Sequence, residues 1–334
     1  MANERPTEFP LLTGANLSDG DLFIGVDVSD TTDNAAGSDV RMVASEVVDG
    51  LSRRFKMTSI ADPATPTAGV HLFSKLNAGK HHLRYIDPAG LKISLQPALQ
   101  GNSVFLVTVA SGTTAPSCLG GTLTTAATMS MQQTIASANP WLATQRKRFA
   151  TAATAANVSG MRTAYTQWFR GNAAGFGGFY FRGMVGQNIN LNGAQLFFGL
   201  AASTAALGTG AGAVAALVNM CGIGYDTTDA STGNWFFYRN DGSGTATKVD
   251  LGATQAARNT THGYDLHMHM QPNSGDLYVK IDNIHTGVNI LDTVYNTDIP
   301  AVNTGMAFHA DVNNGAVASA ANMDVSRVYI ESDY

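Results

Sequence analysis

The chain has 334 residues, of which only 13% are charged, while 44% are hydrophobic and 35 are glycine. That length suits two or three domains, and the composition is typical of an all-β assembly protein with many turns rather than of a cytosolic enzyme. The net charge of −5 argues against a dedicated nucleic-acid binder. The sequence contains no apolar run of about 18 residues, so it predicts no membrane-spanning helix.

Charge is unevenly distributed along the chain. No aspartate or glutamate occurs between Asp87 and Asp226, whereas this middle segment contains seven basic residues: Lys92, Arg146, Lys147, Arg148, Arg162, Arg170 and Arg182. The preceding segment has 8 basic and 12 acidic residues, and the following one has 5 and 13. A mechanism that needs a carboxylate from the middle segment is therefore excluded. Two roles for the basic side chains stay open: pairing with the acidic ends across protomers, or contact with an anionic surface.

The first 60 residues are predicted to form an extended arm. They begin with a polar segment and continue with the apolar run Asp21–Val28, which favours a strand. Pro63 and Pro66 follow within a few residues, and the residue before a proline is biased towards extended backbone. We place the first domain boundary there, at residues 60–61.

Residues 61–100 are predicted to form a small β module. Residues 70–73 and 83–86 have the composition of short strands, and the sequence Asn77-Ala78-Gly79 between them favours a turn. The module is expected to end close to Gly101, where a longer succession of short apolar segments begins.

Residues 101–334 contain about a dozen predicted strands separated by turn signals, which indicates a β-sandwich or barrel. Residues 161–170 alternate in character and predict one such strand, and residues 179–182 predict another. The expected fold class is therefore all-β, with an arm and a small β module followed by a jelly-roll sandwich.

Particular motifs in all three parts resemble tail-fibre and other virion structural proteins of tailed bacteriophages. Leu12-Thr13-Gly14-Ala15-Asn16-Leu17 and the segment 21–32 resemble their N-terminal anchoring segment, and residues 62–99 look like a module common in such proteins. The remainder, which ends in Val328-Tyr329-Ile330-Glu331, is similar to concanavalin-like, lectin-like β-sandwiches. The resemblance implies a homotrimer in the virion, made in the host bacterial cytoplasm.

Within that resemblance, the N-terminus would attach to other virion proteins through five apolar residues: Leu22, Phe23, Ile24, Val26 and Val28. The C-terminal sandwich would face the host surface, and the function implied is a tail fibre or receptor-binding protein for a host glycan. Two alternatives stay open. One is a capsid decoration or head-fibre protein without a ligand, and the other is a polysaccharide depolymerase.

Carboxylates offer little support for catalysis. A glycosidase needs two carboxyl groups across a cleft, and in the last third of the chain most candidates, including Asp226 and Asp265, are aspartates in segments rich in turn-forming residues. We therefore expect a protein that is not an enzyme and needs no cofactor. The oxygen-rich segment Asp226–Asp229 is compatible with a calcium loop, but a turn is the favoured interpretation.

His267 and His269 alternate on a predicted strand, so both side chains point to one face. In a trimer, the pair could surround a metal ion on the axis, since imidazole suits iron, nickel or zinc. The alternative is a solvent-facing pair, with Leu266, Met268 and Met270 turned to the core.

Five residues of the basic middle segment are predicted to share one exposed face, because they have the same parity within their strands: Arg162, Trp168, Arg170, Tyr180 and Arg182. Arginine beside aromatic rings suits either an anionic glycan or an intersubunit surface. The cluster Arg146-Lys147-Arg148 is expected to be a solvated turn.

Overall fold

The computed structural model describes residues 22–27, 38–43, 57–86, 88, 92–94, 102–109, 111–126, 128–173, 177–229 and 233–333. The chain forms two compact units, residues 1–58 and 59–334. In the first unit, β1 (Leu22–Asp27) and β2 (Ser38–Val43) pair antiparallel. Four of the five predicted attachment residues, Leu22, Phe23, Ile24 and Val26, belong to β1, and Val28 lies outside the described residues.

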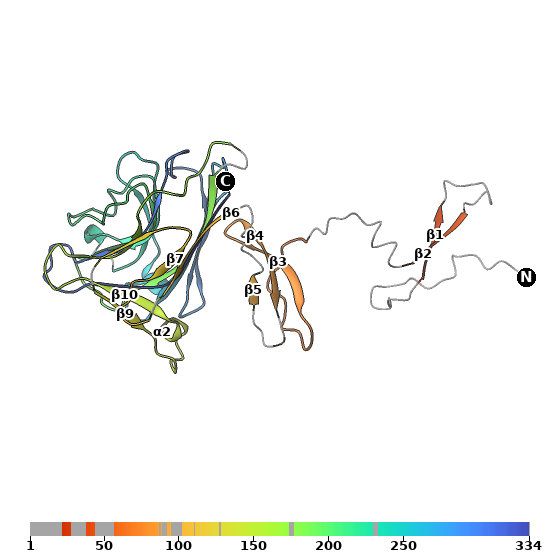
Figure 1. Ribbon diagram of the computed structural model, residues 1–334, viewed down its shortest axis with the longest axis horizontal. Coiled ribbons are helices and arrows are strands. Elements are labelled where there is room, and N and C mark those ends of the chain that lie inside the picture. Colours follow the sequence, from red (N-terminus) through yellow and green to blue (C-terminus); the bar gives the residue numbers. More distant parts are fainter. Residues whose placement is uncertain are drawn as a thin grey trace, which may run out of the picture. The chain divides into compact units, whose positions relative to one another are not determined.

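The second unit begins with a small antiparallel sheet of three strands in the order β3-β4-β5 (Figure 1). These strands are β3 (His71–Asn77), β4 (Lys80–Ile86) and β5 (Lys92–Ser94). The turn between β3 and β4 consists of Ala78 and Gly79, both with positive φ, of 46° and 70°. Two successive residues with positive φ match the right-handed twist of a hairpin. The predicted hairpin around Asn77-Ala78-Gly79 is thus confirmed.

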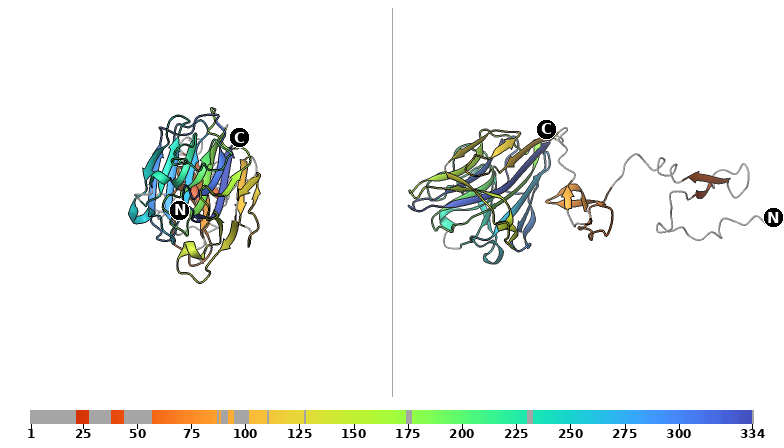
Figure 2. Two further views of the ribbon diagram at one scale, coloured as in Figure 1. Left: turned by 90° about the vertical axis from the view of Figure 1, so that its left-hand side faces the viewer. Right: turned by 60° about the horizontal axis from the view of Figure 1, so that its bottom comes forward.

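The rest of the second unit is a sandwich of two large antiparallel sheets (Figures 1 and 2). The nine-stranded sheet has the order β19-β18-β17-β12-β21-β10-β9, and β6 extends it by pairing with β21 on one side and β7 on the other. Its strands are β6 (Asn102–Thr108), β7 (Ser117–Leu119), β9 (Thr128–Gln132), β10 (Arg146–Ala150), β12 (Gly177–Gly186), β17 (Gly263–Met270), β18 (Leu277–Asn283), β19 (Asn289–Tyr295) and β21 (Asn322–Asp333).

The seven-stranded sheet has the order β16-β15-β14-β13-β20-β11-β8. Its strands are β8 (Leu123–Ala126), β11 (Val158–Thr163), β13 (Gln195–Ala201), β14 (Met220–Tyr225), β15 (Phe236–Asn240), β16 (Thr247–Asp250) and β20 (Ala307–Asn313). Three short helical turns complete the described part of this unit: α2 (Pro140–Ala143), η3 (Thr227–Asp229) and α3 (Ala253–Ala256). The predicted all-β class and jelly-roll sandwich are confirmed.

The core lies between the two sheets and is built from the inward-facing residues, which alternate with outward-facing ones along each strand. Phe181 on β12 packs edge-to-face on Phe198 of β13, with ring centroids 5.6 Å apart, and Phe198 packs in the same way on Phe308 of β20. All three side chains are fully buried. Such aromatic pairs add to the hydrophobic free energy of burial.

One predicted strand was too long. Residues 161–170 do not continue as a single strand, because β11 ends at Thr163 and residues 164–170 form a bend followed by an isolated bridge between Trp168 and Met306. Burial of the Trp168 ring against Phe105, at a centroid distance of 5.2 Å, accounts for this departure. A helix long and apolar enough to cross a membrane is not found among the described residues.

Candidate functional site

The outer surface of the nine-stranded sheet contains a continuous set of polar side chains, which we call the polar face: Tyr180, Arg182, Asp265, His267, His269 and Glu331. Side chains alternate along a strand, so Leu266, Met268 and Met270 point to the core, as predicted, and the residues between them point outward. The register places Tyr180 opposite both His269 and Glu331, and Arg182 opposite His267. Strands β12, β17 and β21 therefore supply one surface.

The tip of the β3–β4 hairpin covers part of this polar face. The Asn77 amide Nδ2 donates to His267 Nδ1 at 2.8 Å and to the Tyr180 hydroxyl at 3.2 Å. Lys80 Nζ forms an ion pair with Glu331 Oε1 at 2.5 Å, and the Tyr329 hydroxyl donates to Glu331 Oε2 at 2.5 Å. The contacts of Asn77 and Lys80 join residues more than 100 positions apart, so polar groups hold the small module on the sandwich.

Close packing accompanies these hydrogen bonds. Gly79 lies directly against the Tyr278 ring, since a Cβ atom on this glycine would come within 2.5 Å of the ring carbons. Its φ of 70° also belongs to the left-handed region that side chains disfavour. Both the turn and the close approach therefore require glycine at this position.

Electrostatics hold the centre of the polar face in one ionisation state. Arg182 contacts Asp265 with two nitrogens, at 3.2 and 2.7 Å, and His267 Nε2 lies 3.4 Å from the same carboxylate. Burial alone would raise the pKa of Asp265, but His267 and Arg182 together hold it well below its usual range. Burial raises the pKa of Tyr180. Asp265 is thus an anion and Tyr180 a neutral hydroxyl at physiological pH.

The predicted single face of five residues is wrong. Arg182 and Tyr180 lie on the nine-stranded sheet, whereas Arg162 is on β11 of the seven-stranded sheet. Trp168 is buried in the core, and Arg170 donates to the carbonyl of Ser274 from a loop. Parity orders side chains within one strand but carries no information about which sheet the strand joins.

Arg162 belongs instead to a buried polar cluster on the seven-stranded sheet. Its Nη1 donates to Asp311 Oδ1 at 2.9 Å, and His309 Nδ1 lies 3.1 Å from Asp311 Oδ2. His309 Nε2 lies 2.6 Å from the carbonyl oxygen of Ser203, and Arg162 Nε donates to that of Thr204. These contacts tie the segment after β13 to the outer surface of the seven-stranded sheet.

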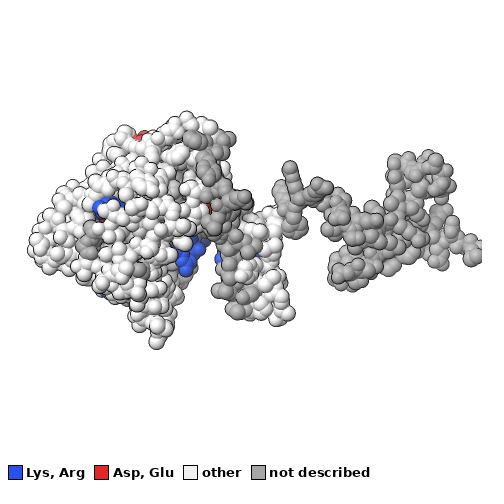
Figure 3. Space-filling view, in the orientation of Figure 1, with Lys and Arg blue, Asp and Glu red and all other residues white. Residues whose placement is uncertain are grey.

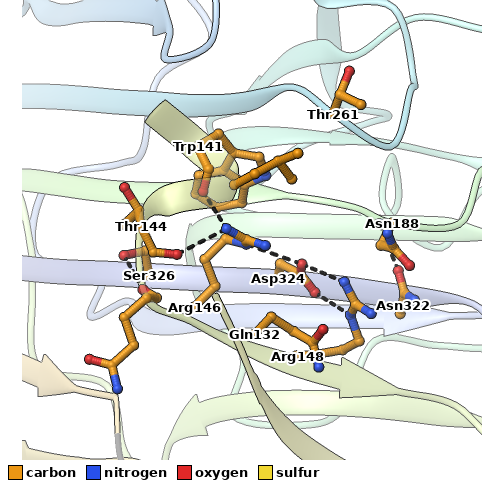
Figure 4. A network of polar contacts seen from close by, with 12 residues as sticks. Gln132, Trp141, Thr144, Arg146, Arg148, Asn188, Thr261, Asn322, Asp324 and Ser326 are labelled. Carbon is orange, nitrogen blue, oxygen red and sulfur yellow. Dashed lines mark hydrogen bonds and ion pairs between the residues drawn. The ribbon is translucent and has the colours of Figure 1, made fainter. Parts of the chain in front are cut away.

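The cluster Arg146-Lys147-Arg148 is not a solvated turn but β10 itself (Figure 4). Arg148 contacts Asp324 with two nitrogens, at 2.7 and 2.8 Å, and Arg146 Nε reaches the same carboxylate at 3.4 Å. Arg146 also lies over the ring of Trp141 and donates to the Trp141 and Thr144 carbonyls. Two guanidinium groups therefore share one buried carboxylate as their ion-pair partner.

These pairs explain the uneven charge of the sequence. Arg146, Arg148, Arg162 and Arg182 come from the segment without acids, and their carboxylate partners all lie between Asp265 and Asp324. Antiparallel pairing of β10 with β21, β11 with β20 and β12 with β17 brings the two segments together. Pairing within one chain was not among the expected roles. Figure 3 shows few charged atoms on the visible described surface, in agreement with this burial.

The histidine pair does point to one face, as predicted, but it is neither solvent-facing nor placed for an axial metal. The chain's own hairpin covers both residues: His267 contacts Asn77, and the backbone of Ala78 lies beside His269. His267 has protein partners at both ring nitrogens. Burial of both residues under their own chain argues against the predicted metal on a trimer axis. Among the described residues, no group of three or more His, Cys, Asp or Glu side chains could hold a metal.

The segment Asp226–Asp229 holds the fold rather than a cation. Asp226 accepts backbone N–H groups from Gly212, Val214 and Ala215, with its Oδ2 oxygen 2.8 Å from the Val214 nitrogen. Asp229 accepts from the Tyr238 hydroxyl and from Lys248. Protein donors thus surround oxygens that a calcium ion would need.

No protein-family model and no curated protein matches the chain. Similar solved structures include a protein of unknown function from Shewanella oneidensis MR-1, 11% identical with a TM-score of 0.43, covering 71% of this chain and 89% of that one. Arcelin-5, a lectin-like defense protein from Phaseolus vulgaris, is 8% identical with a TM-score of 0.41 and covers 70% and 99%. A CBM2 module of the evolved Dit protein of Lactobacillus casei BL23 phage J-1 is 16% identical, with a TM-score of 0.37 and coverage of 57% and 77%. Similarity at this level carries no argument about function.

Proposed function

We propose that this chain is a non-enzymatic bacteriophage virion protein, a tail fibre or receptor-binding protein that presents its sandwich to a host-surface glycan. The observation that carries the proposal is the division of the chain at residue 58. The unit 1–58 contains the segment that resembles phage anchors, and the unit 59–334 is a sandwich fastened to its small module. Such a division suits attachment by one unit and presentation by the other. The proposal includes assembly as a homotrimer.

The state of the buried carboxylates supports a binding rather than a catalytic role. A glycosidase needs a carboxylic acid whose pKa is raised, so that it can protonate the leaving group. Asp265 has the opposite shift, and Asp311 and Asp324 are each in contact with arginine. Asp226 is committed to three backbone N–H groups. A depolymerase built on these residues would need different surroundings for each of them.

The uncovered edge of the polar face is where we propose that glycan binds. The Arg182 side chain is 37% exposed although it is paired with Asp265. On the neighbouring strand β18, Lys280 and Asp282 form a partly exposed pair at 3.3 Å. Guanidinium and carboxylate groups held in place by each other offer several fixed donors and acceptors to sugar hydroxyls, and little conformational entropy is lost on binding.

Variants in the two units test the proposal separately. The double change Phe23→Asp and Val26→Asp introduces charge into β1 and is expected to reduce incorporation into phage particles at least tenfold, without changing adsorption of the purified protein to host cells. Arg182→Gln is expected to reduce adsorption at least fivefold and to leave incorporation unchanged. The measurements are immunoblotting of purified particles and binding of labelled protein to cells.

Arg327→Gln is the matched control, because Arg327 is an exposed arginine on β21; it should alter neither quantity. Full-length protein that neither adsorbs to host cells nor competes with phage infection would overturn the receptor-binding proposal. Location on the head in electron micrographs of immunolabelled particles would favour the decoration alternative instead.

A further inference from the structure

The contact between hairpin tip and polar face is built from four consecutive residues. Asn77 contacts His267 and Tyr180, Ala78 contacts His269, Gly79 lies on Tyr278, and Lys80 pairs with Glu331. Lys80 Nζ also lies 5.3 Å from the centre of the Tyr180 ring. Nearly every contact is polar or aromatic, so its strength depends on the ionisation state of the groups involved rather than on apolar area alone.

One more histidine, His82, lies at this contact. Its ring packs edge-on against Tyr180, at a centroid distance of 4.9 Å, and its Nε2 atom is buried without a hydrogen-bond partner among the described residues. The charged or titratable groups around it are Lys80 and Arg84 on its own strand, Glu331 on β21, and His267 on β17. The carboxylate of Glu331 is already engaged by Lys80 and Tyr329.

We propose that the hairpin is a latch released by acid: it stays on the polar face while His82 is neutral, and it detaches when His82 binds a proton. Detachment would uncover Tyr180 and Tyr278 while leaving the two sheets of the sandwich intact. The proposal does not depend on what the protein binds.

The direction of the pH dependence follows from proton linkage. Burial, helped by Lys80, lowers the pKa of His82 from 6.5 to about 4. A detached hairpin would return His82 to water and to its ordinary pKa. Docking is therefore at full strength well above pH 6.5 and weakens as pH falls, by up to tenfold per pH unit, about 150-fold by pH 4 and about 300-fold in all at still lower pH. Burial also lowers the pKa of His269 to about 4, which adds in the same direction.

Hydroxyl-radical footprinting of the full chain tests the latch. Tyr180 is expected to be protected at pH 7.5 and oxidised at pH 4.5, at least tenfold faster. Trp141, which is buried on the same sheet away from the hairpin, should stay protected at both values. His82→Phe keeps a ring against Tyr180 but cannot bind a proton, and it should slow Tyr180 oxidation at pH 4.5 by at least fivefold. Selectively ¹⁵N-labelled histidine, observed by NMR in the unaltered chain, gives an independent titration of His82.

Three results would overturn the proposal: Tyr180 that remains protected at pH 4.5, Tyr180 and Trp141 that become exposed together, or a His82 titration near pH 6.5 with the hairpin still docked. If His82→Phe does not dock at pH 7.5, the NMR titration of the unaltered chain decides, and the expected result is a His82 midpoint that coincides with the exposure of Tyr180.

Discussion

Replacing Asp324 with alanine is expected to lower the free energy of unfolding by about 3–5 kcal/mol, because it leaves the buried guanidinium group of Arg146 and the half-buried one of Arg148 without their shared anion. Arg148 would lose both of its contacts with Asp324, and Arg146 would lose the ion pair that accompanies its carbonyl contacts. Urea unfolding followed by circular dichroism measures this change in the free energy of unfolding. Asp324→Asn should lower the free energy of unfolding by less than Asp324→Ala does, since asparagine retains a hydrogen-bond acceptor.

Asp292→Ala provides the matched comparison, because Asp292 is an exposed carboxylate on β19 of the same sheet. It should change stability by no more than about 0.5 kcal/mol. Equal effects of the Asp324 and Asp292 substitutions would show that the arginine pair does not depend on Asp324.

Replacing Trp141 with alanine is expected to cost about 3–5 kcal/mol, the usual range for a buried tryptophan. Pro140 begins α2, and Asn139 caps it by accepting the backbone N–H groups of Trp141 and Leu142. This arrangement turns the Trp141 ring onto the outer surface of the nine-stranded sheet. There it packs on Gly186 and Gly263, with Arg146 over its ring at 5.0 Å.

A double-mutant cycle sharpens this prediction. A Cβ on Gly263 would lie 2.1 Å from the Trp141 ring, so Gly263→Ala alone should cost roughly 1–3 kcal/mol by overpacking. In the Trp141→Ala background the same change should be nearly neutral, because the clashing ring is gone. Additive effects of the two substitutions would mean that the ring does not occupy this position.

Local signals in the sequence were sufficient for the fold class and for the elements closest to the site. Alternation along residues 266–270 placed three apolar side chains inward and two histidines outward, and the Asn77-Ala78-Gly79 turn was recognisable from its composition. Each of these inferences uses residues within one strand or one turn, where backbone geometry fixes the relation between neighbours.

The partners of the charged residues could not be predicted in the same way. Arg162 and Asp311 are 149 positions apart, and Asn77 and His267 are 190 apart. Strand order, not local pattern, decides which of these meet, and a single sequence does not specify strand order. Asn77, Lys80, Tyr278 and Glu331 were therefore missed as members of the site.

The uneven charge did contain a usable signal. Arg146–Arg148 lie more than 50 positions from any acidic residue in the sequence. Distant carboxylates therefore had to supply any pairing within this chain. Buried positions on β10 and β11 then make such pairing necessary, because an unpaired buried charge is strongly destabilising. Sequence position alone did not show that these arginines are buried.

The central claim is that four arginines of the basic middle segment, Arg146, Arg148, Arg162 and Arg182, pair with carboxylates of their own chain. A double-mutant cycle on Arg162 and Asp311, with Arg162→Met and Asp311→Asn, tests it most directly through urea unfolding at several protein concentrations. The predicted coupling energy is about 2–3 kcal/mol at every concentration, as for a buried ion pair inside one protomer. A coupling energy near zero, or one that arises only where the protein self-associates, would contradict the account.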